Sequence, residues 1–326
     1  MSYKKIGDSH SKYLAATDIL IGDMSDINYE FLLFNRPIIL LANQWLRDNF
    51  PDIGIKTDID GLEKAIQRSI EQPDEFEEEI KLWLRKTMHK PDGKSSQRVL
   101  DIIIKKSGII NPEIVLVHGG INVISHFLIP LHREAKKRNI NSKLVNTIRK
   151  NDHNNNIIYI SAHNDSLSVP FGYKVHIDHG LKGVGVTDFQ QQIVQYKNKH
   201  YYMHTDLHIT EGKISYEKTQ KLLGPYSDRA LMVGFPKSDI LIQLNTVENK
   251  EAVCIELGFD PCIPLVTYAP AGKYKYPFKQ GASLSNRVIN KLKKISKSQD
   301  FNILVKLKYP RKLIFQRVIN KIKSSL

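Results

Sequence analysis

A stretch near the N-terminus has the residue types and the order of a phosphate-binding turn. A short apolar run at 18–22 leads into a polar turn at 22–26, and a helical pattern and a second apolar run, ending at residue 41, follow. At the carboxyl edge of a parallel sheet, such a turn points the free N–H groups of the helix toward a ligand. Ser25 adds a hydroxyl, and Ser25 or Asp26 can also cap the helix. The pattern therefore predicts a phosphate site, with plain capping as the alternative.

Histidines supply the candidates for acid–base chemistry. His179 precedes Gly180 in a predicted loop after an apolar run, and an imidazole titrates near neutral pH, so His179 is the best candidate base. A loop histidine that only binds backbone is the alternative. His118 is followed by two glycines, which allow either close approach of a ligand or a plain tight turn.

The spacing of His200, His204 and His208 is that of a metal site on one helical face. The residues around them are β-rich, however, which favours structural histidines and no metal. The chain also lacks the phosphate loop of ATPases, the glycine fingerprint of dinucleotide enzymes and the nucleophile elbow of serine hydrolases. These three classes are therefore disfavoured.

The elements that would position these residues alternate along the chain. Helical patterns occupy about 61–71, 73–88 and 95–106, and a new strand at 114–117 enters a helix at about 121–137, which predicts a domain boundary near residue 110. Further strands are expected at about 142–146, 156–160, 173–177, 201–206, 230–233, 264–268 and 302–307. Alternation of this kind predicts parallel sheets covered by helices.

Length and composition limit the class of protein. A chain of 326 residues with 41% hydrophobic and 25% charged residues favours two ordinary globular domains. It has no apolar run of about 18 residues, so no membrane span is expected, and its N-terminus lacks the apolar core of a signal peptide. Cys254 and Cys262 are expected to be reduced thiols of a cytoplasmic protein.

The positive charge is concentrated at one end of the chain. The net charge is +14, and residues 273–326 contain fifteen Lys or Arg against one acid, Asp300. Such a basic segment suggests a phosphate-rich partner, namely a nucleotide donor, a polyanionic polymer or an anionic membrane surface. A lysine-rich solvated face is the alternative. No RNA-binding signature is present, so nucleic acid is not expected.

The turn at 22–26 resembles an element of the CDP-glycerol glycerophosphotransferase (teichoic acid polymerase) family. In that family a strand runs into Ser-Asp-Tyr-Ser-Ser, and the helix after it ends in Asn or Asp, Lys or Arg, then Pro-Ile-Ile. Asp23, Ser25 and residues 35–39 match this pattern, whereas Gly22 replaces the first serine and Asp26 the last. Because a carboxylate repels a pyrophosphate, either Asp26 points away as a cap or the donor site is altered.

Four more segments resemble family motifs. Residues 176–183 resemble a His-Gly-Thr-Pro-Leu-Lys loop whose histidine is held to be catalytic, and 234–241 resemble Gly-Tyr-Pro-Arg-Asn-Asp. Residues 264–270 resemble Ile-Leu-Tyr-Ala-Pro-Thr, and 301–310 resemble a strand that ends in Lys-Leu-His-Pro or similar, with Lys308 in place of the histidine. The resemblance implies a catalytic His179, donor phosphate-binding by Asp23, Ser25, Asp26 and Lys308, and donor or acceptor loops with Gly180, Lys182, Pro236, Thr267 and Pro270.

The family resemblance implies two Rossmann-like α/β domains of the GT-B type, but with their segments in an unusual order. Residues 1–107 resemble the second half of the donor-binding domain, 112–245 the acceptor-side domain, and 246–326 the first half of the donor-binding domain. We expect 246–326 to pack on 1–107, because each half alone would leave an apolar sheet uncovered. The chain is then either circularly permuted or a fragment of two consecutive modules.

The resemblance also implies a reaction. Glycerol phosphate, or a related polyol phosphate, would move from a CDP-linked donor to a wall or capsule polymer with loss of CMP, and no metal or cofactor is required. The alternatives are a nucleotide-sugar glycosyltransferase or epimerase of the same fold, and a non-catalytic module that binds a polyanion or a membrane through 273–326. A helical apolar stripe at 313–322 adds the expectation of peripheral binding to the inner face of the cell membrane, with packing on the sheet as its alternative.

Overall fold

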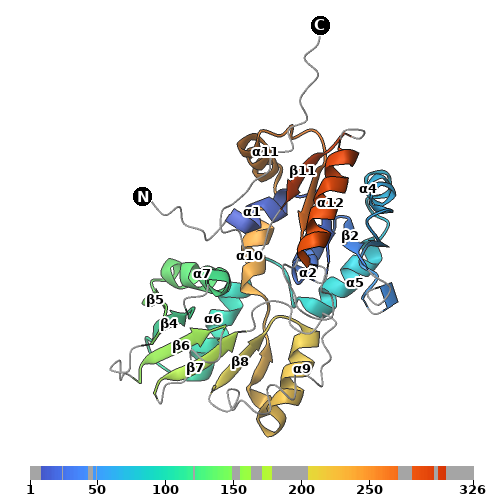
Figure 1. Ribbon diagram of the computed structural model, residues 1–326. Helices are drawn as coiled ribbons and strands as arrows, with labels where there is room; N and C mark the ends of the chain where they lie inside the picture. Colours follow the sequence, from blue (N-terminus) through green and yellow to red (C-terminus); the bar gives the residue numbers. More distant parts are fainter. Residues whose placement is uncertain are drawn as a thin grey trace. The chain divides into compact units, whose positions relative to one another are not determined.

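The structure is a computed structural model that forms two compact units (Figure 1). We call Leu84–Gln243 the central unit, and His10–Trp83 together with Leu244–Leu326 the split unit. Each is described by itself. The structure describes residues 9–23, 25–42, 47–48, 50–119, 122–148, 155–162, 171–177, 205–270, 281–296 and 300–305.

The split unit contains a parallel five-stranded sheet with strands from distant parts of the sequence. Its strand order is β11-β10-β1-β2-β3. Strand β1 pairs on one side with β10, where Ile19 lies opposite Val266, and on the other with β2, where Leu20 lies opposite Ile38. The strands are β1 (Ile19–Gly22), β2 (Ile38–Leu41), β3 (Ile55–Thr57), β10 (Leu265–Ala269) and β11 (Asn302–Val305).

Helices cover both faces of this sheet. On one face α4 (Leu62–Glu71) and α12 (Gly281–Ile295) share a buried core with the strands. On the other face α1 (Ser9–Ala16) and α11 (Val247–Leu257) contribute to a second cluster around Leu265. Between β1 and β2 the chain forms the short helix α2 (Ile27–Phe31) and a 3-10 turn, η1 (Leu32–Phe34). Because the strands are apolar on both faces, this double covering removes them from water.

The central unit contains a parallel six-stranded sheet with the order β5-β4-β6-β7-β8-β9. Its strands follow one another in a single stretch of the chain, unlike those of the split unit. The strands are β4 (Glu113–Val117), β5 (Ser142–Val145), β6 (Ile157–Ser161), β7 (Tyr173–Ile177), β8 (Leu207–Thr210) and β9 (Ala230–Met232).

Two helices, α6 (Ser95–Ser107) and α7 (Asn122–Lys137), pack on one face of the central sheet. Val99, Leu100 and Ile103 of α6 recur at helical spacing and are fully buried in that core. The remaining elements are α9 (Lys213–Leu223), the 3-10 segment η4 (Gly224–Arg229) and α10 (Pro236–Gln243), while α5 (Glu77–Thr87) spans the point where the two units join in sequence.

The prediction of an α/β protein with parallel sheets and covering helices is confirmed. Two details differ from expectation. Strand β8 occupies 207–210, after the expected 201–206, of which 201–204 lie outside the described residues. The short strand β3 was not predicted. The GT-B arrangement of the two domains stays a prediction. No helix in the described part of the chain is long and apolar enough to cross a bilayer.

The unit boundary also differs from the one expected near residue 110. Helix α6 belongs to the central unit, because its apolar face packs on Ile114, Leu116 and Ile158. A local helical pattern cannot reveal which sheet a helix will cover, so this assignment needed the tertiary contacts.

Candidate functional site

The candidate donor site is the turn that follows β1 at the carboxyl edge of the split-unit sheet. The backbone oxygen of Asp23 accepts a hydrogen bond of 2.8 Å from the N–H of Ser25, and Ser25 in turn accepts one of 3.1 Å from the N–H of Asn28. These bonds fold the chain tightly into α2. The hydroxyl of the half-buried Ser25 makes no hydrogen bond to any described residue, so it is available to a ligand.

Asn28 holds this turn from within. Its side chain is fully buried, and its amide nitrogen donates to the backbone oxygen of Asp23 at 2.5 Å. A Cβ at Gly22 would come within 1.9 Å of the Asn28 Oδ1 atom. The glycine that replaces the family's first serine therefore has a structural reason: it leaves room for Asn28.

Capping by Asp26, one of the two sequence expectations, is not what the structure has. Asp26 is the residue before α2, but its backbone is already helical and its side chain makes no capping hydrogen bond. Asp26 is exposed, and its backbone oxygen accepts from the N–H groups of Tyr29 and Glu30. The turn is thus shaped by Asn28 and by backbone bonds rather than by an acidic cap.

The run at 35–39, which matches the end of the family element, has a structural role here. Asn35 adopts the left-handed conformation that ends η1. The Arg36 guanidinium donates to the backbone oxygens of Ala15 (2.7 Å) and Thr17 (2.6 Å) and to Asn245 Oδ1 (2.7 Å). Burial lowers the pKa of Arg36 from its ordinary value, and the nearby Asp18 charge opposes that shift. Arg36 therefore fastens the end of α1 to the sheet.

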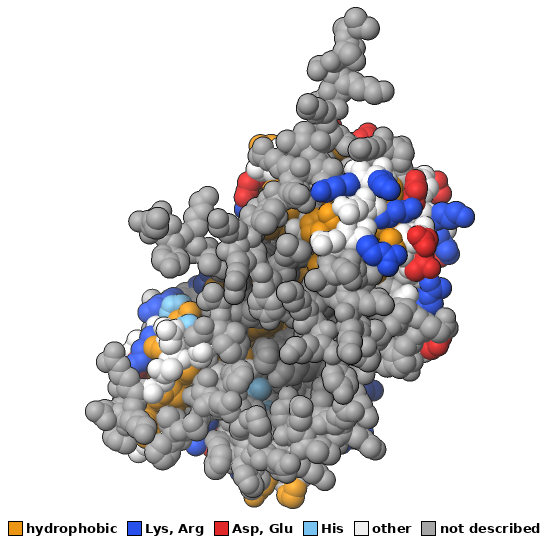
Figure 2. Space-filling view, in the orientation of Figure 1, with side chains coloured by type: hydrophobic (Ala, Val, Ile, Leu, Met, Phe, Trp, Pro, Cys, Tyr) orange, Lys and Arg blue, Asp and Glu red, His pale blue; other side chains and the backbone are white. Residues whose placement is uncertain are grey.

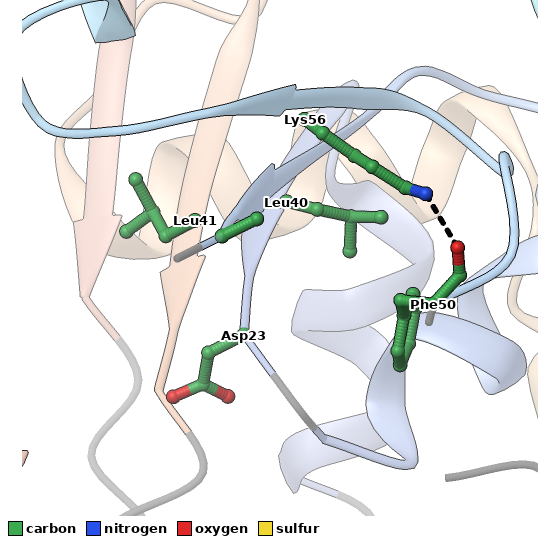
Figure 3. A pocket seen from close by; sticks show the side chains of 6 residues that line it. Asp23, Leu40, Leu41, Phe50 and Lys56 are labelled. Carbon is green, nitrogen blue, oxygen red and sulfur yellow. Dashed lines mark hydrogen bonds between the residues drawn. The ribbon is translucent and has the colours of Figure 1, made fainter. Parts of the chain in front are cut away.

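A small pocket lies beside the turn, where β1, β2 and β3 end (Figure 3). It is lined by Asp23, Leu40, Leu41, Ala42, Phe50 and Lys56. The Lys56 ammonium donates to the backbone oxygens of Phe50 (2.5 Å) and Arg47 (2.9 Å) and pairs with Asp52 at 2.7 Å. Lys56 thus fixes one wall of the pocket. It was not singled out from the sequence, because only the pairing of β3 with β2 brings it to this edge.

Two further predicted site residues lie on β10, the other neighbour of β1, or directly after it. Thr267 is buried, and its hydroxyl lies 2.6 Å from the hydroxyl of Thr17. Since Thr17 donates to the Tyr13 backbone oxygen, Thr267 is the donor of this pair. Thr267 therefore joins α1 to the sheet, whereas Pro270 lies buried just past the end of β10, at the same edge as the turn.

In the central unit, the segment 234–239 ties two helices together. Gly234 has a φ of 132°, and a Cβ there would lie 2.9 Å from the Ser95 hydroxyl, so glycine is required. Pro236 opens α10 and is buried. The buried Asp239 carboxylate accepts hydrogen bonds from the N–H groups of Ser95 (2.9 Å) and Ser96 (2.7 Å), which caps the start of α6.

The carboxyl half of the central sheet carries polar side chains. Ser161, His176 and His208 lie opposite one another across β6, β7 and β8, and all three are buried. The two histidine rings are 5.5 Å apart in an edge-to-face arrangement, and His208 also bonds the Thr205 hydroxyl. The expectation of a structural His208 thus fits its position. His118 follows β4 at the same edge, and burial lowers its pKa.

The remaining predicted site residues lie outside the described residues: His179, Gly180, Lys182 and Lys308. The same holds for His200, His204 and the helix expected at 313–322. Within the described ranges, no cluster of three His, Cys, Asp or Glu side chains could hold a metal ion.

Comparison with known proteins points to one family. Residues 4–105 match the model of the CDP-glycerol:poly(glycerophosphate) glycerophosphotransferase family. This segment contains the whole turn at 22–26 and the strands β1, β2 and β3. This segment, which is less than half of the chain, is similar to that glycerophosphotransferase family. No curated protein sequence matches the chain with significance.

Two solved structures show distant similarity. The wall teichoic acid polymerase TagF is 14% identical, with a TM-score of 0.34, over 67% of this chain and 61% of that one. The chain thus spans less than two thirds of the TagF chain. Glutamate racemase from Francisella tularensis subsp. tularensis SCHU S4 is 11% identical, with a TM-score of 0.24, over 90% of this chain and 98% of that one. At such low TM-scores, nothing about this chain's function follows from either.

Proposed function

We propose that this protein transfers glycerol phosphate, or a related polyol phosphate, from a CDP-linked donor to a polymer acceptor. The observation that carries the proposal is the Asp23–Ser25 turn, which stands at the carboxyl edge of a parallel sheet within the segment that matches the family. Ligands of open α/β sheets bind at this edge. The Ser25 hydroxyl would donate to the donor phosphates, and the pocket beside it would take part of the donor nucleotide.

The reaction requires an in-line displacement at the phosphorus that bears the polyol. An acceptor hydroxyl oxygen would form the new bond to this phosphorus, and the bond from phosphorus to the bridging oxygen would break, so that CMP leaves. His179 would take the proton of the acceptor hydroxyl, and Lys308 would stabilise charge on the phosphates. The parts given to these two residues rest on the sequence resemblance.

Asp23 and Asp26 need different roles from Ser25, because their carboxylates repel phosphate. Asp23 lines the pocket, so it would accept a hydrogen bond from a donor hydroxyl. Asp26 is exposed beside the turn and would lie at the entrance.

The test is release of CMP from CDP-glycerol in the presence of a glycerol phosphate polymer. We expect Ser25→Ala to weaken donor binding measured by calorimetry, and His179→Ala to abolish turnover while sparing donor binding. Ser227→Ala, a hydroxyl deletion in the central unit on η4, is the matched control and should change neither. Absence of both CDP-glycerol binding and CMP release in the wild type, beside an active family member, would contradict the proposal.

A further inference from the structure

Helix α12 carries a basic stripe on its exposed face. Val288, Leu292 and Ile295 point into the core of the split unit. Arg287 and Lys294 are exposed, and Lys291 is half-exposed. Spacings of four and three residues place the three side chains on one side of the helix. Figure 2 shows Lys and Arg side chains over α12, whereas on the side of the neighbouring α4 they are mixed with Asp and Glu.

These cations lack the acidic partners that others in the split unit have. Among the described residues, neither Arg287, Lys291 nor Lys294 forms an ion pair, and α12 itself contains no acid. Elsewhere in the split unit, acids compensate the cations in the pairs Lys12–Glu256, Lys56–Asp52, Arg68–Glu75, Lys81–Glu77 and Lys250–Asp18. The stripe is therefore a local excess of positive charge on a folded surface.

Helix stability does not account for the whole stripe. Lysines in the last turn favour the negative end of the helix dipole, which explains Lys293 and Lys294. Arg287 lies in the first half of α12, where a positive charge gains nothing from the dipole. A surface selected for helix stability alone would not need a cation there.

The position of α12 relates the stripe to the candidate donor site. The helix follows β10, whose carboxyl end adjoins that of β1 and hence the Asp23–Ser25 turn. Because α12 connects two parallel strands, it runs back toward the opposite edge of the sheet. The stripe from Arg287 to Lys294 therefore leads away from the site over about 10 Å of helix.

We propose that the α12 stripe binds the poly(glycerol phosphate) chain of the acceptor behind its reacting end. This inference rests on the proposed function. A linear phosphodiester carries one negative charge per repeat, so an extended chain matches a row of cations. An anionic bilayer is the less suitable partner, because the described stripe presents no exposed apolar side chain that would enter the lipid.

The experiment compares two triple variants that lose the same charge. Arg287→Gln/Lys291→Gln/Lys294→Gln removes the stripe. Lys105→Gln/Lys106→Gln/Lys136→Gln removes three exposed cations from α6 and α7 of the central unit. Calorimetric titration with poly(glycerol phosphate) of defined length, at low and high salt, should show binding at least about tenfold weaker for the stripe variant and a smaller salt dependence. The control should bind like the wild type.

A second readout separates this inference from the proposed function. With a short soluble glycerol phosphate acceptor, the stripe variant should release CMP at the wild-type rate, because such an acceptor does not reach the stripe. An inactive wild type that still binds polymer through the stripe would contradict only the proposed function. The inference would be overturned if both variants lost polymer binding equally. It would also be overturned if the stripe variant, with an unchanged circular dichroism spectrum, bound the polymer like the wild type. Stripe-dependent binding to phosphatidylglycerol vesicles without binding to the polymer would likewise overturn it.

Discussion

In each of the two units, a charged residue of a family-like segment forms hydrogen bonds to the backbone at one end of a helix. The residue is an acid in the central unit and a base in the split unit. In the central unit, the Asp239 carboxylate receives two N–H groups at the start of α6. In the split unit, the Arg36 guanidinium donates to two carbonyl oxygens at the end of α1. Each charge complements the sign of the helix end that it meets.

Residues of the family-like segments therefore fall into two kinds, those that stabilise the fold and those that can contact a ligand. Asp239 and Arg36 lie in segments that resemble the family, yet in this structure both satisfy backbone groups and neither lines the described pocket. Ser25, in contrast, has a hydroxyl without a described partner. Motif residues that complete the fold should therefore affect stability when changed, whereas those that face the ligand should affect binding and turnover.

The strongest effect on stability is expected for Asp239. Asp239→Ala should lower the free energy of unfolding of the central unit by about 3 kcal/mol, because two buried N–H groups of α6 lose a charged acceptor. Hydrogen exchange of α6 peptides should rise, while peptides of α1 and β10 keep their protection. Asp239→Asn, which keeps one acceptor oxygen, is the control and should lose less. Wild-type protection of α6 in Asp239→Ala would remove Asp239 from the comparison.

Arg36 tests the other side of the comparison. Arg36→Met keeps much of the side-chain bulk but leaves the Ala15 and Thr17 oxygens unpaired, so it should destabilise the split unit by about 2 kcal/mol. Exchange should rise in peptides of α1. Arg36→Lys retains the charge and one hydrogen bond, and it should fall between the wild type and Arg36→Met. If Arg36→Met kept its stability but lost donor binding, Arg36 would instead belong to the site.

Gly22 and Asn28 form the coupled pair that links stability to the site. Gly22→Ala should cost about 1.5 kcal/mol in a urea titration, because its Cβ would overlap Asn28 Oδ1. In an Asn28→Ala background the same change should cost much less, which a double-mutant cycle measures. Gly22→Ala should also weaken CDP-glycerol binding, since the turn would shift. Additive costs of the two changes would show that Asn28 does not set the space at Gly22.

The smallest expected effect is a difference in pH dependence between the units. Burial, together with nearby cations at two of the positions, lowers the pKa of His89, His118 and His132, all in the central unit. A lowered pKa means that the unfolded chain binds protons more readily, so stability falls as the pH drops below about 6.5. Exchange protection of central-unit peptides should decrease between pH 7.5 and 5.5.

Among the described residues of the split unit, pKa shifts that bear on acid stability fall on carboxylates. The backbone N–H of Gly61 lowers the pKa of Asp58, and Lys81 lowers that of Glu77. Their contribution is lost only at more acidic pH, as the carboxylates take up protons. The triple variant His89→Gln/His118→Gln/His132→Gln should flatten the pH response of the central unit alone. An equal response of both units in the wild type would argue against this assignment.

The sequence by itself predicted the class of fold and many of its elements, but not β3 or the position of β8. The helical spacing at 95–106 and the apolar runs at 114–117 and 173–177 correspond to α6, β4 and β7 within a residue or so. These features are local, since a side chain's period along the chain reports whether the backbone is helical or extended. The family resemblance likewise came from residues close together in sequence.

Only the tertiary structure decided which sheet each helix covers and what each motif residue contacts. The periodicity of the sequence does not predict which distant residues become neighbours. Examples are the pairs Ser95 and Asp239, Thr17 and Thr267, and Lys56 and Leu40. The same is true of Gly22. It departs from the family pattern, and only the structure shows that the missing side chain leaves room for Asn28. These contacts depend on how chain segments far apart in sequence pack together. Two side chains cannot occupy the same buried volume, and buried polar groups must find hydrogen-bond partners.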